Sequence, residues 1–148
     1  MAMGDLKGVH SDFVQLEGAR RIRFHVLTAG ERTGEPILFV HGNASSATFW
    51  QEAMACLPSR FRSIAPDLAG YGLTETLPVD ATRGVRDWSD DLHALIESMN
   101  LDRVHLVGWS MGGGISLQYL LDHPQMVASL TLVSTVSPYG FSGTRGAD

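Results

Sequence analysis

The segment Gly108-Trp109-Ser110-Met111-Gly112 constrains the fold of this chain more than any other stretch of it. The apolar residues 104–107 before it predict a buried strand, and residues 115–121 after it predict a helix that must end before Pro124. A strand that turns into a helix so abruptly holds the turn residue in a strained conformation, and small residues two positions away on either side avoid collisions. The sequence therefore predicts that the Ser110 hydroxyl is presented at the carboxyl end of a strand, beside the positive end of a helix.

Composition excludes several classes of protein. The 148 residues match the size of one ordinary domain, and 44% hydrophobic with 18% charged residues is typical of a soluble globular protein. The net charge of -5 offers no basic surface for nucleic acid or for an anionic membrane. Residues 1–10 lack the apolar core of a signal peptide, and no run is long enough to span a membrane. We therefore expect a cytoplasmic protein.

The other reactive side chains predict neither a disulfide nor a metal site. Cys56 is the one cysteine, and its apolar neighbours predict a buried, inert thiol. We expect a helix that Thr82 caps and that runs through Asn100. Asp90 and Asp91 lie off its apolar stripe, so we expect them on a solvated face. We expect no cofactor and no metal.

Strand and helix patterns alternate along the chain. We expect strands over 12–18, 21–29 and 36–40, and then a helix from about Ser46 that ends before Pro58. A strand over 61–66 follows, and after it the helix capped by Thr82. The last elements are a strand over 104–107, a helix over 115–121 and a strand over 127–133. In the second strand His25 falls on the polar side of an alternating pattern, which favours a surface histidine. This order predicts an α/β fold with a doubly wound, mostly parallel sheet.

Three unusual loops follow strands of this sheet. They are His41-Gly42-Asn43, the segment 67–72 (Asp-Leu-Ala-Gly-Tyr-Gly), and the turn at Ser110. Because the carboxyl ends of parallel strands meet at one edge of a sheet, and ligands bind at that edge, we expect these loops to form a site.

These three segments resemble the α/β-hydrolase superfamily. Their order and spacing match its N-terminal half, through about the sixth strand, so we expect residues 1–133 to form half of the core. Residues 134–148 would be a flexible segment that leads toward a lid and a C-terminal half. The chain is most similar to the capped branch of esterases, carbon–carbon hydrolases, dehalogenases and epoxide hydrolases. The segment His41-Gly42-Asn43, with Trp50 seven residues after Asn43, resembles the dehalogenases. However, Ser110 stands where dehalogenases and epoxide hydrolases carry an aspartate, which disfavours both chemistries.

The resemblance implies a role for Ser110 and its neighbours. Ser110 matches the nucleophile that forms an acyl-enzyme, and the backbone N–H groups of Met111 and Asn43 match the oxyanion hole. His41 matches a histidine that fixes the loop, and we expect the same architectural role for Asp67.

Trp109 and Tyr71 could line the acyl pocket, or they could equally be packing residues.

The base and the acid of a catalytic triad have no good candidate after Ser110. The chain offers only His123 and Asp122 at a helix end, and Asp148 as its last residue. We expect a separate C-terminal chain to supply both groups, and cleavage within residues 134–148 could produce it. The expected function is a serine hydrolase that acts on a small-molecule ester, lactone or amide. The alternatives are an acyltransferase, a carbon–carbon hydrolase and a non-catalytic ligand-binding protein.

Overall fold

The computed structural model describes residues 6, 8–16 and 21–137. Its strands are β1 (Val9–Leu16), β2 (Ile22–Ala29), β3 (Glu35–Val40), β4 (Phe61–Pro66), β5 (Val104–Trp109) and β6 (Val127–Val133). Its helices are α1 (Gln51–Cys56), α2 (Arg86–Ser98) and α3 (Met111–Asp122), with single 3-10 turns η1 (Ala47–Trp50), η2 (Ala81–Arg83) and η3 (Pro124–Met126). This is the predicted order of strands and helices, and the predicted bounds of β4 and β6 are confirmed.

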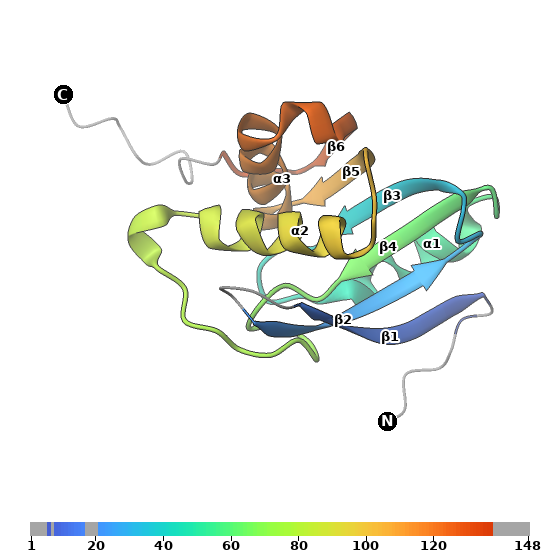
Figure 1. Cartoon of the computed structure of the whole chain (residues 1–148), viewed down its shortest axis with the longest axis horizontal. Helices are drawn as coiled ribbons and strands as arrows, with labels where there is room; N and C mark the ends of the chain where they lie inside the picture. Colours follow the sequence, from blue (N-terminus) through green and yellow to red (C-terminus); the bar gives the residue numbers. More distant parts are fainter. Residues whose placement is uncertain (1–5, 7, 17–20, 138–148) are drawn as a thin grey trace.

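The strands form one sheet in the order β1-β2-β4-β3-β5-β6 (Figure 1). β1 and β2 form an antiparallel hairpin, and β2 is also antiparallel to β4. The remaining neighbours, β4 with β3, β3 with β5 and β5 with β6, are all parallel. The prediction of a mostly parallel sheet is confirmed, and the carboxyl ends of β3, β4 and β5 meet at one edge.

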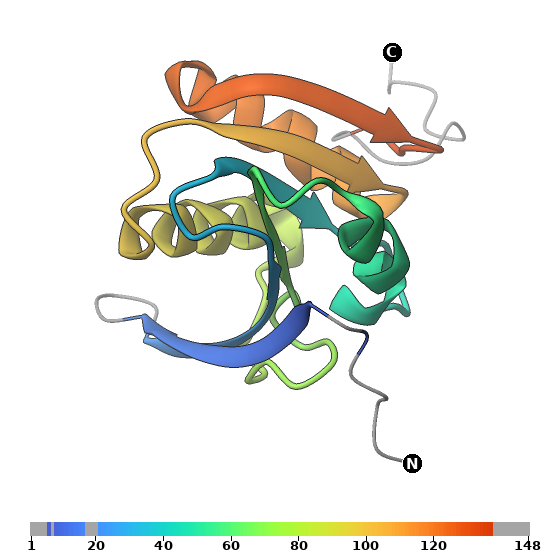
Figure 2. The same ribbon diagram turned by 90° about the vertical axis from the view of Figure 1, so that its right-hand side faces the viewer.

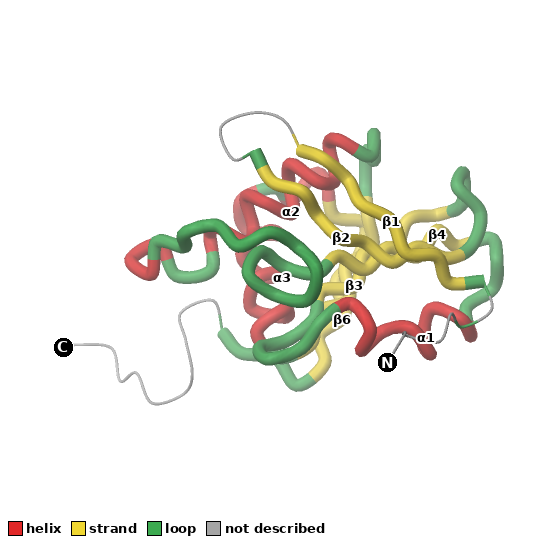
Figure 3. The backbone as a smooth tube through the Cα atoms, turned by 90° about the horizontal axis from the view of Figure 1, so that it is seen from below, coloured by secondary structure: helices red, strands yellow, loops and turns green. Residues whose placement is uncertain are grey.

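Helices cover both faces of the sheet. Figure 2 shows α2 and α3 on one face and α1 on the other, and Figure 3 shows α1 and α2 on opposite sides of the strands. The larger core cluster lies under α2 and α3, and the second lies under η1 and α1, around Phe39, Trp50 and Met54. The doubly wound architecture is therefore confirmed over the part of the chain that is described.

The helix expected from Thr82 begins later, at Arg86. Both the backbone N–H and the hydroxyl of Thr82 donate to the Asp80 carboxylate, at 2.9 and 2.6 Å. These bonds stabilise the short turn η2, and Gly84, with φ of 63°, separates it from α2. Thr82 thus lies in a turn of its own, before the helix that it was expected to cap.

Two predictions of exposure on helices were wrong. Asp91 was expected on a solvated face but is only 2% exposed, because it lies one helical turn after Asp87, which is also buried. Asp90 is partly exposed and pairs with Arg83 at 2.7 Å. Cys56 was expected to be buried and is exposed, because it lies two residues after the buried Met54 and so on the other side of α1.

β6 forms the outer edge of the sheet. Its side chains are mostly exposed, and Leu132 and Val133 are 39% and 40% exposed. Among the described helices, none combines the length and the apolar character that a transmembrane span requires.

Candidate active site

Ser110 is the single residue between the end of β5 and the start of α3. Its backbone has φ of 55° and ψ of -119°, a conformation that costs a non-glycine residue of the order of 1–3 kcal/mol. The predicted abrupt turn from strand to helix is therefore confirmed. Its consequence is a half-buried serine at the carboxyl edge of the sheet, at the N-terminus of α3.

The two flanking glycines have no room for a side chain. A Cβ atom added to Gly108 would lie 2.6 Å from the carbonyl oxygen of Gly112 and 2.7 Å from the Cα of Gly113. A Cβ atom added to Gly112 would collide with the carbonyl oxygens of Val40 and His41 at the end of β3. The steric reason given for the two glycines is thereby confirmed, and Gly112 also lets α3 approach β3.

The chain that leaves β6 holds the turn from the other side. The N–H of Ser110 donates to the Val133 carbonyl at 3.0 Å, and the N–H of Val136 donates to the Ser110 carbonyl at 3.1 Å. The N–H groups of Gly113 and Gly114 donate to the same carbonyl. The strained backbone of Ser110 is thus fixed by its own helix and by the loop after β6.

The loop after β3 passes directly against Ser110. A Cβ atom added to Gly42 would lie 2.9 Å from the Trp109 ring and 3.0 Å from the Cβ of Ser110. The next residue, Asn43, accepts hydrogen bonds through its Oδ1 from the Tyr71 hydroxyl at 2.7 Å and from the Ala44 N–H at 3.0 Å.

Tyr71 and Trp109 lie differently at this edge. The Tyr71 hydroxyl also lies 3.9 Å from the Met111 sulfur, so the structure brings Asn43, Tyr71 and Met111 together beside Ser110. The Trp109 ring stacks on Phe49, with ring centroids 4.2 Å apart and planes 7° from parallel. This stacking favours a packing role for Trp109, whereas Tyr71 reaches the loops around the serine.

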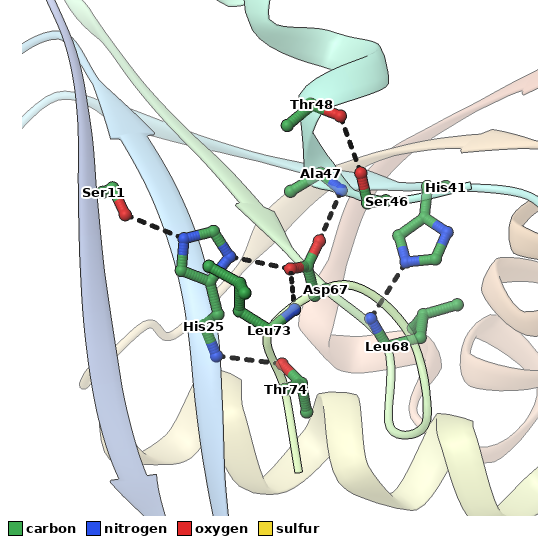
Figure 4. Close-up of polar contacts among 10 residues, drawn as sticks. All are labelled: Ser11, His25, His41, Ser46, Ala47, Thr48, Asp67, Leu68, Leu73 and Thr74. Carbon is green, nitrogen blue, oxygen red and sulfur yellow. Dashed lines mark hydrogen bonds and ion pairs between the residues drawn. The ribbon is translucent and has the colours of Figure 1, made fainter. Parts of the chain in front are cut away.

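A buried network ties the loops after β3 and β4 together (Figure 4). The Asp67 carboxylate, 1% exposed, accepts hydrogen bonds from the backbone N–H of Ala47 at 2.6 Å and of Leu73 at 2.8 Å. A Cβ atom on Gly72 would collide with this carboxylate. Asp67 therefore acts as a tie between loops, and its expected architectural role is confirmed.

His25 belongs to the same network, and its prediction as a surface residue was wrong. The side chain is 1% exposed; Nδ1 lies 2.8 Å from Asp67 Oδ2, and Nε2 lies 2.8 Å from the Ser11 hydroxyl. β2 lies inside the sheet, between β1 and β4, and the loop after β4 covers it: Thr74 Oγ1 accepts the His25 N–H at 2.9 Å. The alternation in β2 had indicated one exposed face, which this loop covers.

His41 holds the start of the loop after β4. Its Nε2 accepts the Leu68 N–H at 3.0 Å, so Nδ1 carries the proton and donates to the Gly42 carbonyl at 2.8 Å. Burial lowers the pKa of His41, against smaller opposing effects of the Gly42 hydrogen bond and of Asp67. His41 is therefore neutral and structural, as the sequence predicted.

No histidine in the described part of the chain contacts the Ser110 hydroxyl. His25 and His41 are engaged in the Asp67 network, His93 and His123 stack on each other with centroids 3.8 Å apart, and His105 bonds Ser129 and Glu35. The described residues also contain no group of three metal-binding side chains. The described residues thus present a strained serine at this edge of the sheet, but no histidine that could activate it.

Comparison with known proteins identifies the family. The family model described as "alpha/beta hydrolase fold" matches residues 35–145. The chain is 37% identical over 118 residues to a 2-hydroxy-6-oxo-2,4-heptadienoate hydrolase of Pseudomonas putida, covering 78% of this chain and 42% of that protein. It is also 37% identical over 114 residues to a putative carbamate hydrolase, RutD, of Variovorax paradoxus, covering 76% of this chain and 42% of that protein.

A solved structure shows the same fold. A mutant epoxide hydrolase of Vigna radiata superposes with a TM-score of 0.78 at 31% identity, covering 89% of this chain and 40% of that one. The chain spans less than half the length of the relatives that it matches. Because the family model matches three quarters of its residues, the chain belongs to the α/β-hydrolase family.

Proposed function

We propose that this chain carries the nucleophile of a serine hydrolase that acts on a carboxylic ester, lactone or amide. The observation that carries the proposal is the backbone of Ser110, held at φ of 55° between β5 and α3. The family stores such strain at its nucleophile, and a side chain presented this way can reach a carbonyl carbon. The hydrolases among its relatives support this class of chemistry.

The reaction would proceed through an acyl-enzyme on Ser110. The Ser110 oxygen attacks the carbonyl carbon while its proton passes to a base, which then returns the proton to the leaving alcohol or amine. The backbone N–H groups of Met111, in the first turn of α3, and of Asn43, in the loop against Ser110, would stabilise the oxyanion. Water then attacks the acyl-enzyme: the base takes a proton from the water and returns it to the Ser110 oxygen, which releases the carboxylic acid. Tyr71 would shape the pocket through its bond to Asn43.

The histidine and the acid would come from a C-terminal half of the enzyme. This half could be a separate partner chain, as the sequence predicts, or a continuation of the same polypeptide. Intact mass of the native particle distinguishes the two. We propose residues 1–133 as the N-terminal half of the core and residues 134–148 as the segment that leads toward the rest; residues 138–148 lie outside the described part.

A fluorophosphonate probe tests the nucleophile in the intact protein. We expect Ser110 to be labelled, and the Ser110→Ala variant to lose labelling and at least about 10³-fold of the hydrolytic rate, because no other group replaces the nucleophile. The matched controls are Ser11→Ala and Ser129→Ala, because these two hydroxyls also bond a histidine. Labelling that persists in Ser110→Ala but disappears in Ser11→Ala would move the nucleophile to Ser11. Absence of labelling in the intact protein would favour a non-catalytic binding protein.

A carbon–carbon hydrolase is the second candidate. The relative from Pseudomonas putida, by its name, hydrolyses a 2-hydroxy-6-oxo dienoate. Rates on p-nitrophenyl esters and on such a dienoate, followed by loss of the dienoate absorbance, separate the two candidates. We expect the ester rate to be higher; a dienoate rate at least tenfold higher would favour the second candidate. An acyltransferase would instead transfer the acyl group of the p-nitrophenyl ester to an added alcohol faster than to water.

A further inference from the structure

A cavity of about 430 Å³ lies at the end of the sheet opposite Ser110. Its walls come from β1, β2 and the start of β4, from the turn after β2, and from the last residues of α2 and the residues that follow it. Arg62 lies near the start of β4 and Asp67 directly follows its end, so about five residues, or roughly 17 Å of strand, separate the cavity from the Ser110 edge. A ligand in this cavity would not touch the serine.

Two arginines line this cavity. Arg62 is half-buried, and Arg32 comes from the turn after β2. In the described part of the chain, no carboxylate lies within ion-pair distance of either guanidinium. Burial, and then the positive charge of Arg32, lower the pKa of Arg62. Two like charges are therefore brought together without compensation, in a chain whose net charge is -5.

Neutral donors and one acid complete the walls. Thr28 and Asn100 line the cavity, and their side chains carry a hydroxyl and an amide that can donate hydrogen bonds. Register explains the arrangement: Thr28 lies opposite Ile64, so Thr28 and Arg62 lie on the same face of the sheet, and Asp12 lies opposite Val26 on that face. Asp12 lines the same cavity but does not pair with either arginine.

We propose that this cavity binds a small organic dianion, with a phosphate or dicarboxylate group held by Arg62 and Arg32. The planar fork of arginine binds both groups through paired hydrogen bonds, and a bound dianion would remove the repulsion between the two guanidinium groups. The volume suits a small molecule larger than the anionic group itself. Asp12 lines the same cavity and carries the same sign of charge as the ligand, so its repulsion limits the affinity.

Calorimetric titration of the intact protein with inorganic phosphate, at constant ionic strength, tests the site. We expect Arg62→Gln to weaken phosphate binding at least tenfold and the more exposed Arg32→Gln to weaken it less. We expect Arg62→Lys to give an intermediate affinity, because it keeps the charge but not the fork. Asp12→Asn should tighten binding several-fold, because it removes a repulsive charge while its side-chain oxygen can still accept the Phe13 N–H.

Arg60→Gln is the matched control, because Arg60 lies outside the cavity, over the Phe61 ring. It should leave the affinity unchanged, and unchanged melting temperatures without ligand would show that the variants fold. A parallel titration with malonate distinguishes the two ligand types: tighter malonate binding indicates a dicarboxylate, and tighter phosphate binding indicates a phosphate ester. The proposal is wrong if neither anion binds, if Arg62→Gln binds within twofold of the parent, or if Asp12→Asn weakens binding.

Discussion

The two sides of Ser110 are built in opposite ways. On the side of β3 and β4, the loops are tied by the buried carboxylate of Asp67, and Gly42 packs against the serine. On the side of β6, the chain holds the serine backbone through Val133 and Val136, but the outer strand exposes apolar side chains. The groups that hold the strained backbone of Ser110 already have hydrogen-bond partners within the described residues. The surface of β6 next to them exposes apolar side chains and is therefore suited to further contacts.

The largest effect should come from the buried side of this comparison. Asp67→Ala removes the acceptor for the buried His25 ring and the buried N–H of Ala47, and for the partly buried N–H of Leu73. A buried donor left without its acceptor costs about 1–3 kcal/mol, so the two buried donors together give a loss of about 2–6 kcal/mol. We expect a loss of this size in the free energy of unfolding, measured by denaturant titration of the intact protein.

The control for this experiment is Asp80→Ala. Asp80 is an exposed carboxylate that also accepts hydrogen bonds, from Thr82, so its loss should cost only about 0.5–1.5 kcal/mol. Equal losses in the two variants would contradict the view that the Asp67 network holds the loops around Ser110.

A medium effect is expected on the exposed side. If the C-terminal half that we propose pairs with β6, Leu132 becomes buried in the intact protein although it is 39% exposed here. Leu132→Lys should then lower the free energy of unfolding by about 2 kcal/mol, through lost apolar burial and a buried charge. Leu73→Lys is the matched control, because Leu73 is 59% exposed on a loop away from β6 and should change stability by no more than about 0.5 kcal/mol. If the two variants lower the free energy of unfolding by equally small amounts, Leu132 stays exposed in the intact protein.

The sequence predicted the parts of the site that local patterns control. The turn at Ser110, its flanking glycines and the strands β4 and β6 follow from residues close together in the chain, and each was confirmed. The errors concern contacts between distant segments. His25 is covered by a loop some 50 residues later, with Thr74 accepting its N–H, and the pattern within β2 contains no trace of that loop.

The exposure of one further residue could have been predicted from the sequence. Cys56 could have been placed by its angular position relative to Met54 on the helix. The hydrogen bond from Tyr71 to Asn43 could not have been predicted from the sequence, because it joins two loops whose separation depends on the whole sheet. The two arginines of the cavity are also distant in sequence, and they are brought together by the pairing of β2 with β4 and by backbone bonds from the turn after β2 to the residues before β4.

The smallest effect should appear as a pH dependence on the buried side. Burial holds the pKa of His41 below its ordinary value of 6.5, so the unfolded chain binds a proton at a higher pH than the folded chain does. His41 therefore leaves stability unaffected above about pH 6.5 and lowers it as the pH falls below that value. One such group can contribute a slope of at most about 1.4 kcal/mol per pH unit.

His41→Gln isolates this contribution. The Gln side-chain oxygen can replace Nε2 as the acceptor for the Leu68 N–H but does not titrate. Burial also lowers the pKa of His123, with a smaller contribution from His93, so His123 gives a slope of the same sign that remains in the variant. The difference between the two curves of unfolding free energy against pH is therefore due to His41. We expect the variant to have the shallower slope between pH 6.5 and 5, and parallel curves would mean that folding does not lower the pKa of His41.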